Sequence, residues 1–284
     1  MEDRSIVSIE AVIDHIERHL DGKLELETIA EAVHYSKYHL HRLFTKTVGI
    51  TIHDYVQRRQ LTEAAKLLVF SDKPVIEIAL LCGYESQQSF SSAFKAMYKS
   101  PPAAYRERGS FYPLQLPFTL HPAISGREFT AQDIRLAEAA DRSDWMELMR
   151  LVIDGYPVMD EADYLARLEE SISEKRALVL RDGDLLIGAM AFTDSPGSIT
   201  FLGVHPQYRS RGLQRLFLDA LLKTYLPGQE ISTTTFREQD KADTGHRDML
   251  LQLGFAEREL QTEFGYPTQR FVLPPKTQED MGHG

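Results

Sequence analysis

Two stretches about fifty residues apart repeat the same pattern of a short helix, a turn and a second helix. In the first, a helix over 26–33 precedes a helix expected over Ser36–Lys46. In the second, a supporting helix ends near Gly83, where the chain turns, and a helix is expected over Ser86–Met97. Serine is a favoured N-cap because its hydroxyl accepts a main-chain N–H of the first helical turn. The repeat predicts two helix-turn-helix units.

Each second helix combines an apolar stripe with a polar one. Leu40 and Phe44 recur at helical spacing, as do Phe90 and Phe94, which predicts that these residues face a core. The outer stripes and nearby basic positions supply the candidate DNA contacts: Tyr38, His41, Arg42, Lys46, Arg58, Gln87, Gln88, Ser91 and Lys95. The stretch 52–70 between the units reads as one helix that holds them apart. Since major-groove segments on one DNA face lie about 34 Å apart, a single chain is expected to span two of them.

Three segments carry a resemblance to a known family: residues 35–44 (YSKYHLHRLF), 79–90 (ALLCGYESQQSF) and 101–106 (PPAAYR). Over roughly residues 5–107 the chain resembles the AraC family of bacterial transcription regulators. The resemblance implies that the partners are promoter DNA, contacted in the major groove, and RNA polymerase. Glutamine side chains suit adenine and arginine suits guanine, because each pair forms two hydrogen bonds. Two residues depart from the pattern: Lys99 stands where the family often has glycine, and Ser92 where some members are basic.

Length and charge indicate a second domain. The chain has 284 residues, so a DNA-binding segment of about 105 leaves room for another domain of ordinary size. The net charge is −10, of which −1 falls in residues 1–109 and −9 in the rest. DNA affinity therefore has to come from local basic side chains. The acidity of the second part suits a cationic ligand, and solubility explains it equally well.

Cysteine usage and hydropathy indicate the compartment. Cys82 is the only cysteine, the amino terminus is charged, and no apolar run has the length of a membrane helix. His15 and His19 stand four residues apart without the glutamate of a zinc-protease motif. We therefore expect a cytoplasmic bacterial protein with no membrane segment and no metal site.

The expected organisation has four parts. A DNA-binding domain over 5–107 is followed by a linker over 108–132, a second domain over 133–274 and a tail over 275–284. Prolines and glycines mark the linker, although Phe111, Tyr112 and Phe118 predict that part of it packs onto a domain. In the second domain, strands are expected over 134–137, 177–180, 185–193, 199–204, 231–236 and 271–273, and helices over 142–153, 160–173, 213–222 and 246–253. The fold class is thus an all-α domain followed by an α/β (α+β) domain with a mixed sheet.

The segment 204–214 (VHPQYRSRGLQ) lies between a strand and an apolar-faced helix. A glycine-containing, arginine-bearing loop there directs main-chain N–H groups and a helix N-terminus at one point, which suits a pyrophosphate, while an ordinary turn is the alternative. Together with Leu253-Gly254-Phe255, the segment resembles the GNAT acyltransferase superfamily, which binds acetyl-CoA. The resemblance, over about 133–274, implies that the cofactor-binding residues are Val204, Arg209, Ser210, Arg211, Gly212, Leu213 and Gln214.

Three positions depart from the GNAT pattern: one in the phosphate-binding signature and two that many members use for catalysis. Gln214 stands at the final glycine of the signature, and Leu250 at a tyrosine that protonates the leaving thiolate. The strand around 198–202 lacks the usual glutamate base. Acetyl transfer needs a base for the amine and an acid for the sulfur. Other candidates are Tyr156, Glu161, Asp163, His205, Asp243 and His246, and the sequence does not rank them, so the catalytic residues stay unassigned.

Two functions are compatible with these sequence features. In the first, the chain is a sequence-specific transcription regulator whose GNAT-like domain binds a small effector or an acyl-CoA. In the second, it is an acetyl-CoA-dependent N-acyltransferase for an amine-bearing drug or metabolite, with an attached DNA-binding domain. The first is preferred because the DNA-binding motif is intact and the catalytic pattern is not.

Overall fold

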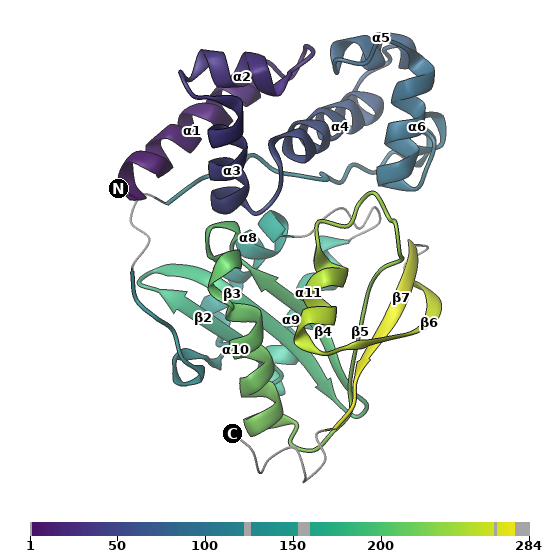
Figure 1. Ribbon diagram of the computed structural model, residues 1–284. Coiled ribbons are helices and arrows are strands. Elements are labelled where there is room, and N and C mark those ends of the chain that lie inside the picture. Colours follow the sequence, from purple (N-terminus) through teal and green to yellow (C-terminus); the bar gives the residue numbers. More distant parts are fainter. Residues whose placement is uncertain (1, 122–125, 153–159, 264–265, 276–284) are drawn as a thin grey trace. The chain divides into compact units, whose positions relative to one another are not determined.

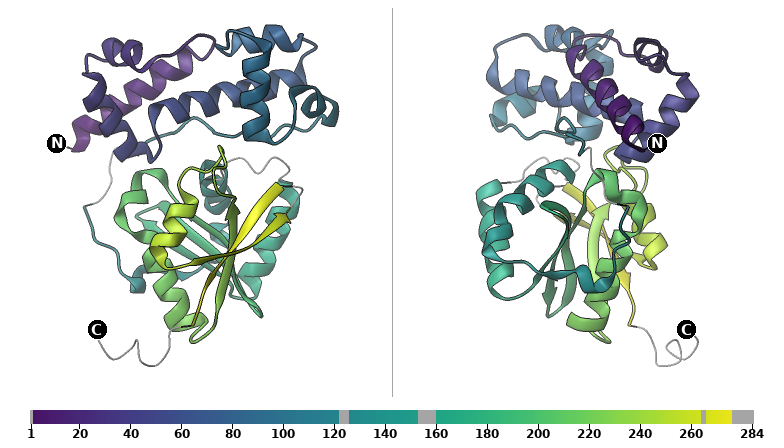
Figure 2. Two further views of the ribbon diagram at one scale, coloured as in Figure 1. Left: turned by 45° about the vertical axis from the view of Figure 1, so that its right-hand side comes forward. Right: turned by 90° about the vertical axis from the view of Figure 1, so that its left-hand side faces the viewer.

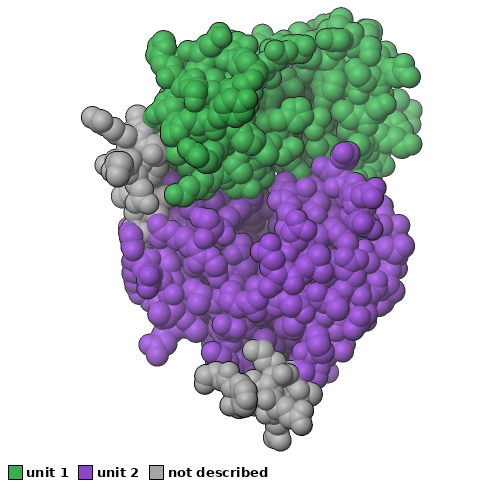
Figure 3. All heavy atoms as spheres, in the orientation of Figure 1, with its two compact units in different colours: residues 1–124, 153–158 green, residues 125–152, 159–284 purple. Residues whose placement is uncertain are grey.

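The computed structural model describes residues 2–121, 126–152, 160–263 and 266–275. The chain forms two compact units, residues 1–124 with 153–158 and residues 125–152 with 159–284 (Figure 3). Within these described ranges, no helix has the length and apolar character needed to cross a membrane.

The first unit is helical (Figure 1). Its helices are α1 (Glu2–Arg18), α2 (Leu26–Ala32), α3 (Lys37–Val48), α4 (Ile52–Phe70), α5 (Val75–Leu81), α6 (Gln87–Tyr98) and α7 (Pro102–Arg108). Both predicted helix-turn-helix units are confirmed, as α2 with α3 and α5 with α6. The long helix predicted between them is confirmed as α4.

The two recognition helices, α3 and α6, begin and end alike. The hydroxyls of Ser36 and Ser86 accept main-chain N–H groups three residues further on, at 3.4 and 3.1 Å. At the other end each helix stops at a residue in the left-handed region, Gly49 with φ 84° and Lys99 with φ 56°. These caps satisfy main-chain groups that a helix leaves unbonded at its ends, so both recognition helices have fixed boundaries.

The turn of the second helix-turn-helix unit contacts the turn that follows α1, beside α4. A Cβ on Gly83, in the turn before α6, would lie 2.6 Å from the carbonyl oxygen of Gly22, in the turn after α1. The side-chain amide of Gln60 on α4 donates to the same oxygen at 2.8 Å. The spacing between the recognition helices is therefore set by this junction as well as by the length of α4.

Residues 110–121 pack along α4, although the sequence assigns them to a linker. The Thr62 hydroxyl accepts the main-chain N–H groups of Leu114 and Gln115, both at 3.1 Å. Phe118 stacks on Tyr55 with the ring centroids 5.4 Å apart. This segment is thus part of the first unit, in agreement with the expectation that its aromatic side chains pack onto a domain.

The second unit is an α/β layer structure built on a mixed seven-stranded sheet. The strands are β1 (Arg135–Leu136), β2 (Ala177–Asp182), β3 (Leu185–Asp194), β4 (Gly197–Val204), β5 (Ile231–Phe236), β6 (Ala256–Glu263) and β7 (Tyr266–Leu273), in the order β1-β2-β3-β4-β5-β7-β6. The helices are α8 (Arg142–Val152), α9 (Glu161–Ser173), α10 (Leu213–Ala220) and α11 (His246–Leu253). Helices α8 and α9 cover one face of the sheet, and α10 and α11 cover the other (Figures 1 and 2). The predicted fold class is confirmed.

Strands β4 and β5 separate after a short contact. They run parallel and pair only at Ser198 with Ser232, while the hydroxyl of Thr233 donates to the Ile199 carbonyl at 2.9 Å. Beyond these residues β4 continues to Val204 alongside β3 alone. The carboxyl-terminal half of β4 therefore has an open side toward β5.

The sequence missed β6 and most of β7. It predicted a single strand over 271–273, whereas residues 256–263 and 266–273 form an antiparallel pair. This prediction was wrong because 256–263 (AERELQTE) lacks apolar alternation. The strand lies at the sheet edge with most of its side chains exposed. Arg247 of α11 holds it in place by donating to Glu257 at 2.5 Å and to Gln269 of β7 at 2.8 Å.

Candidate functional site

The first recognition helix, α3, has one buried and one exposed face. Its buried side chains are Leu40, Phe44 and Val48. Its exposed side chains include Tyr38, His41, Arg42 and Lys46, and Tyr38 is 79% exposed. The four predicted DNA contacts of α3 therefore lie together on one accessible surface.

The second recognition helix, α6, is built in the same way with different chemistry. Its buried side chains are Phe90, Phe94, Met97 and Tyr98. Its outer face carries the predicted residues Gln87, Gln88, Ser91 and Lys95, of which Ser91 is half-buried and the others are exposed. Amide and hydroxyl groups dominate here, whereas a guanidinium, an imidazole and a phenol dominate on α3. The two surfaces are thus suited to different base sequences.

Lys37 has a partner on the first helix-turn-helix unit. Its ammonium group donates to the carboxylate of Glu27 on α2 at 2.7 Å. This hydrogen bond lowers the pKa of Glu27 and raises the pKa of Lys37. A phosphate would have to compete with Glu27 for this ammonium group, so Lys37 is a weaker candidate for DNA contact than the exposed Lys46.

The structure corrects the prediction for Arg58. Its side chain, on α4, is 1% exposed and lies in the interior of the first unit, where a phosphate cannot reach it. The neighbouring Arg59 is 4% exposed and donates to both carboxylate oxygens of Glu17. Arg106, a further basic position, donates to the main-chain carbonyls of Leu68 and Lys73. The sequence could not separate these structural arginines from Arg42, because the spacing along α4 does not show which neighbours cover it.

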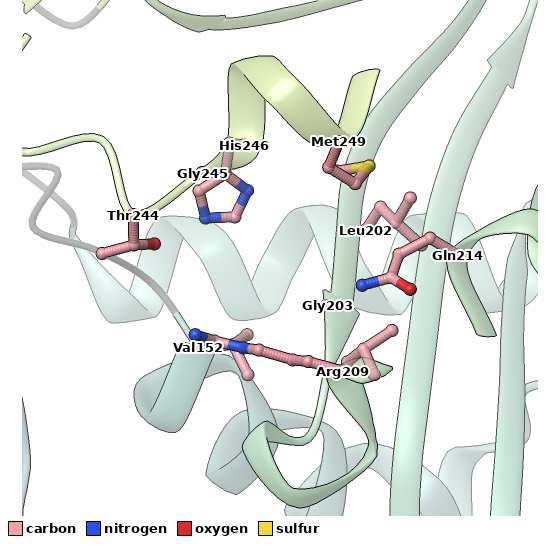
Figure 4. Close-up of a pocket in the computed structure, with 10 residues that line it drawn as sticks. Val152, Leu202, Gly203, Arg209, Gln214, Thr244, Gly245, His246 and Met249 are labelled. Atoms are coloured by element: carbon pink, nitrogen blue, oxygen red, sulfur yellow. The ribbon is translucent and has the colours of Figure 1, made fainter. Parts of the chain in front are cut away.

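A pocket opens in the second unit at the free side of β4 (Figure 4). Its volume is about 70 Å³. It is lined by Val152 from α8, Leu202, Gly203 and Val204 from β4, Arg209 and Gln214 from the loop and the first turn of α10, and Thr244, Gly245, His246 and Met249 at the start of α11. Strand, loop and two helix beginnings thus converge on one site.

The pocket includes three of the seven predicted cofactor-binding residues, Val204, Arg209 and Gln214. The others lie around the loop: Ser210 and Gly212 are exposed, Arg211 lies over the Tyr208 ring at 5.0 Å, and the Leu213 side chain is buried. Leu213 can therefore offer a ligand only its main chain. His246 was among the catalytic candidates of the sequence, whereas no sequence signal assigned the other lining residues to this pocket: Val152, Leu202, Gly203, Thr244, Gly245 and Met249.

The loop has features that fit the phosphates of an acyl-CoA. Gly212 adopts φ 68° at the N-cap of α10, and no side chain caps that helix. A helix N-terminus without a side-chain cap favours a bound anion. The loop is held to the end of β2, because the Tyr208 hydroxyl donates to the Asp182 carboxylate at 2.7 Å. Burial raises the pKa of Tyr208, and the hydrogen bond to Asp182 raises it further.

The structure separates the catalytic candidates. Glu161 bonds Arg150 at 2.8 and 2.7 Å, and His205 is 4% exposed. The Asp243 carboxylate accepts the main-chain N–H groups of Gly245 and His246 at the start of α11. Tyr156 lies outside the described residues. Of the described candidates, His246 is the one that lines the pocket.

Relatives found by sequence comparison match the first unit. A helix-turn-helix domain family matches residues 29–108. The multiple antibiotic resistance protein MarA of Escherichia coli is 38% identical over 100 residues, which are 35% of this chain and 79% of MarA. The uncharacterized regulator YbfP of Bacillus subtilis is 40% identical over 99 residues, which are 35% of this chain but only 34% of YbfP.

A solved structure resembles the second unit. A GNAT-family acetyltransferase from Bacillus cereus covers 51% of this chain and 97% of its own length, with 16% identity and a TM-score of 0.40. The sequence relatives thus cover the first unit, and this structural neighbour covers the remaining half of the chain.

Proposed function

Because the chain belongs to the AraC family of helix-turn-helix transcription regulators, we propose that it binds specific promoter DNA through the outer faces of α3 and α6. One observation carries this proposal: both recognition helices are capped by serine and present exposed polar residues on the side away from the core. Such helices dock in the major groove and contact base edges. As part of this proposal, we expect the chain to act in the bacterial cytoplasm, with RNA polymerase as a further partner.

The chemistry of the two faces suggests an asymmetric operator. Arg42 on α3 is suited to the O6 and N7 atoms of guanine, and Gln87 and Gln88 on α6 to adenine. We expect a guanine-containing half-site followed, one helical turn away, by an adenine-containing one. A selection from random double-stranded DNA would reveal this arrangement directly.

Substitutions on the two faces test the docking. Arg42→Ala and Gln88→Ala are each expected to weaken specific binding by about 1–3 kcal/mol, because each removes a two-hydrogen-bond base contact. The measurement is fluorescence anisotropy on the selected operator at fixed salt. Lys66→Ala is the control, since it removes an exposed cation of α4 that belongs to neither recognition helix. Unchanged affinity in both variants would exclude these helices from the groove.

For the second unit, we propose that the pocket binds a small effector, with an acyl-CoA as the first candidate, and that the bound ligand modulates transcription. The single pairing between β4 and β5, the uncapped start of α10 and the pocket beside Arg209 support this proposal. Acyl transfer to an amine is the second candidate function, and the convergence of Arg209 and His246 on the pocket favours it.

Calorimetry tests the ligand. Acetyl-CoA is titrated into the full chain, and desulfo-CoA serves as the comparison. Micromolar binding of both would support a site that holds the nucleotide and pantetheine parts, whereas failure of both would turn the search to other small effectors. Coupling to DNA is tested separately: if saturating ligand changes neither operator affinity nor transcription, modulation fails even where binding succeeds.

A further inference from the structure

His246 occupies a particular place in the pocket. It is the first residue of α11, and its main-chain N–H donates to the Asp243 carboxylate at 2.7 Å. This bond fixes the first turn of the helix and therefore the direction in which the His246 side chain leaves it. Figure 4 shows the imidazole projecting into the space on whose other side Arg209 lies.

The imidazole also lies beside the opening between β4 and β5. Its ring centroid is 6.1 Å from that of Phe236, the last residue of β5. Gly203, near the end of β4, lines the same pocket. His246 is thus placed between the ends of the two strands that separate after Ser198 and Ser232. A thioester bound in this pocket would therefore lie near the imidazole.

Among the described residues that line the pocket, no side chain other than His246 is a typical proton-transfer group. The other described side chains of the pocket are aliphatic, amide, hydroxyl, thioether or guanidinium groups. Leu250, where many GNAT members have tyrosine, is 4% exposed. Imidazole alone among these groups both accepts and returns a proton near neutral pH.

We propose, resting on acyl-CoA as the ligand of this pocket, that His246 transfers the proton during acyl transfer to a primary amine. The amine nitrogen attacks the thioester carbonyl carbon and forms the C–N bond, and the imidazole accepts the proton that nitrogen loses. The C–S bond then breaks, its electron pair leaves with sulfur, and the imidazolium returns the proton to give the free thiol. One side chain thereby replaces the separate base and acid of other members.

Two ligands test the placement without any turnover. In the full chain, the imidazole resonances of His246, assigned by their loss in His246→Gln, are followed by NMR. Coenzyme A is expected to shift them, because its pantetheine arm enters the pocket, and adenosine 3′,5′-bisphosphate, which lacks that arm, is expected to leave them unchanged. If coenzyme A binds by calorimetry and the signals do not move, the proposal for His246 is wrong, while acyl-CoA binding stands. If coenzyme A does not bind at all, both proposals fail.

Kinetics test the proton transfer itself. Acetyl-CoA and tyramine at high concentration are mixed with the protein, and release of the thiol and formation of the amide are both measured. His246→Gln is expected to lower the rate about 100-fold or more, with coenzyme A affinity within about twofold of the original, a difference of about 0.4 kcal/mol. His53→Gln, the same change at an exposed histidine of α4, is expected to have no effect. A His246→Gln protein that transfers at the original rate would overturn the proposal.

Discussion

Lys99 adopts a backbone conformation that suits glycine. It ends α6 with φ 56°, at the place where Gly49 ends α3 with φ 84°. A left-handed conformation costs a non-glycine residue about 1–2 kcal/mol, and the greater backbone freedom of an unfolded glycine offsets about half of that. The left-handed conformation explains why glycine is frequent at this position in the family. Lys99 does not prevent the fold because the cost of this conformation is small compared with the stability of a domain.

Lys99→Gly is therefore expected to raise the free energy of unfolding by about 0.5–1 kcal/mol. Gly49→Ala, at the corresponding cap of α3, is the matched reverse change and is expected to lower it. Urea denaturation followed by circular dichroism measures both. If Lys99→Gly left the midpoint unchanged or lowered it, the left-handed residue would not be strained.

The sequence could not distinguish basic side chains that are exposed from those that are buried in the core. Arg42 and Arg58 are both helical arginines near apolar neighbours, yet one is exposed and the other is 1% exposed. Distant parts of the chain, such as α1 and the segment 110–121, pack on α4, and the sequence of α4 alone does not show which of its side chains they cover. Cys82 is buried at the end of α5, and this burial raises the pKa of its thiol to about 12. A thiol of that kind is not reactive near neutral pH.

At the scale of elements, local signals were sufficient for the helix-turn-helix units. Ser36, Ser86 and the apolar stripes lie within one or two turns of the helices that they define, so the sequence predicted α3, α4 and α6 closely. Two features that depend on contacts between distant parts of the chain were not predicted. Strand β6 is held by its partner β7 and by Arg247, and the pocket combines α8, β4 and α11, none of which is local in sequence. The loop 204–214 was predictable because strand, glycine and helix follow one another directly.

The contact between the turn of the second helix-turn-helix unit and the turn after α1 gives the prediction at this scale. Gly83→Ala would bring a Cβ to 2.6 Å from the Gly22 carbonyl and would also strain a residue with φ 77°. We expect a loss of about 2–4 kcal/mol in the stability of the first unit. Gly109→Ala is the matched control, because Gly109 has φ 67° with no atom within 4 Å of the added Cβ. Urea denaturation gives the loss of unfolding free energy in each variant, and the difference between the two losses is the cost of the close approach. Equal losses would show that the close approach costs nothing.

At the scale of the whole molecule, each unit has its own core and its own electrostatic anchor. In the second unit that anchor is Asp141, which is 2% exposed and accepts hydrogen bonds from Arg135 at 2.7 Å and Arg181 at 3.0 Å. It joins β1, β2 and the start of α8. Burial alone would raise the pKa of Asp141, but bonds from Arg135, the Glu138 main chain and Arg181 outweigh burial and lower it to about 2.

This pKa gives the second unit a specific response to acid. Since the folded pKa lies below the ordinary value of 3.8, the contribution of Asp141 is present above about pH 4 and is lost as the pH falls toward 2. It amounts to about 2 kcal/mol, from about 1.4 kcal/mol per pKa unit. Trp145 is the single tryptophan and is fully buried in the second unit, so its fluorescence reports the unfolding of that unit. Asp141→Asn is expected to be less stable than the original protein at pH 6, with the gap narrowing as the pH is lowered to 2.5. A gap that stays constant over this range would mean that the arginines do not stabilise the ionised carboxylate, and that the anchor of the second unit lies elsewhere.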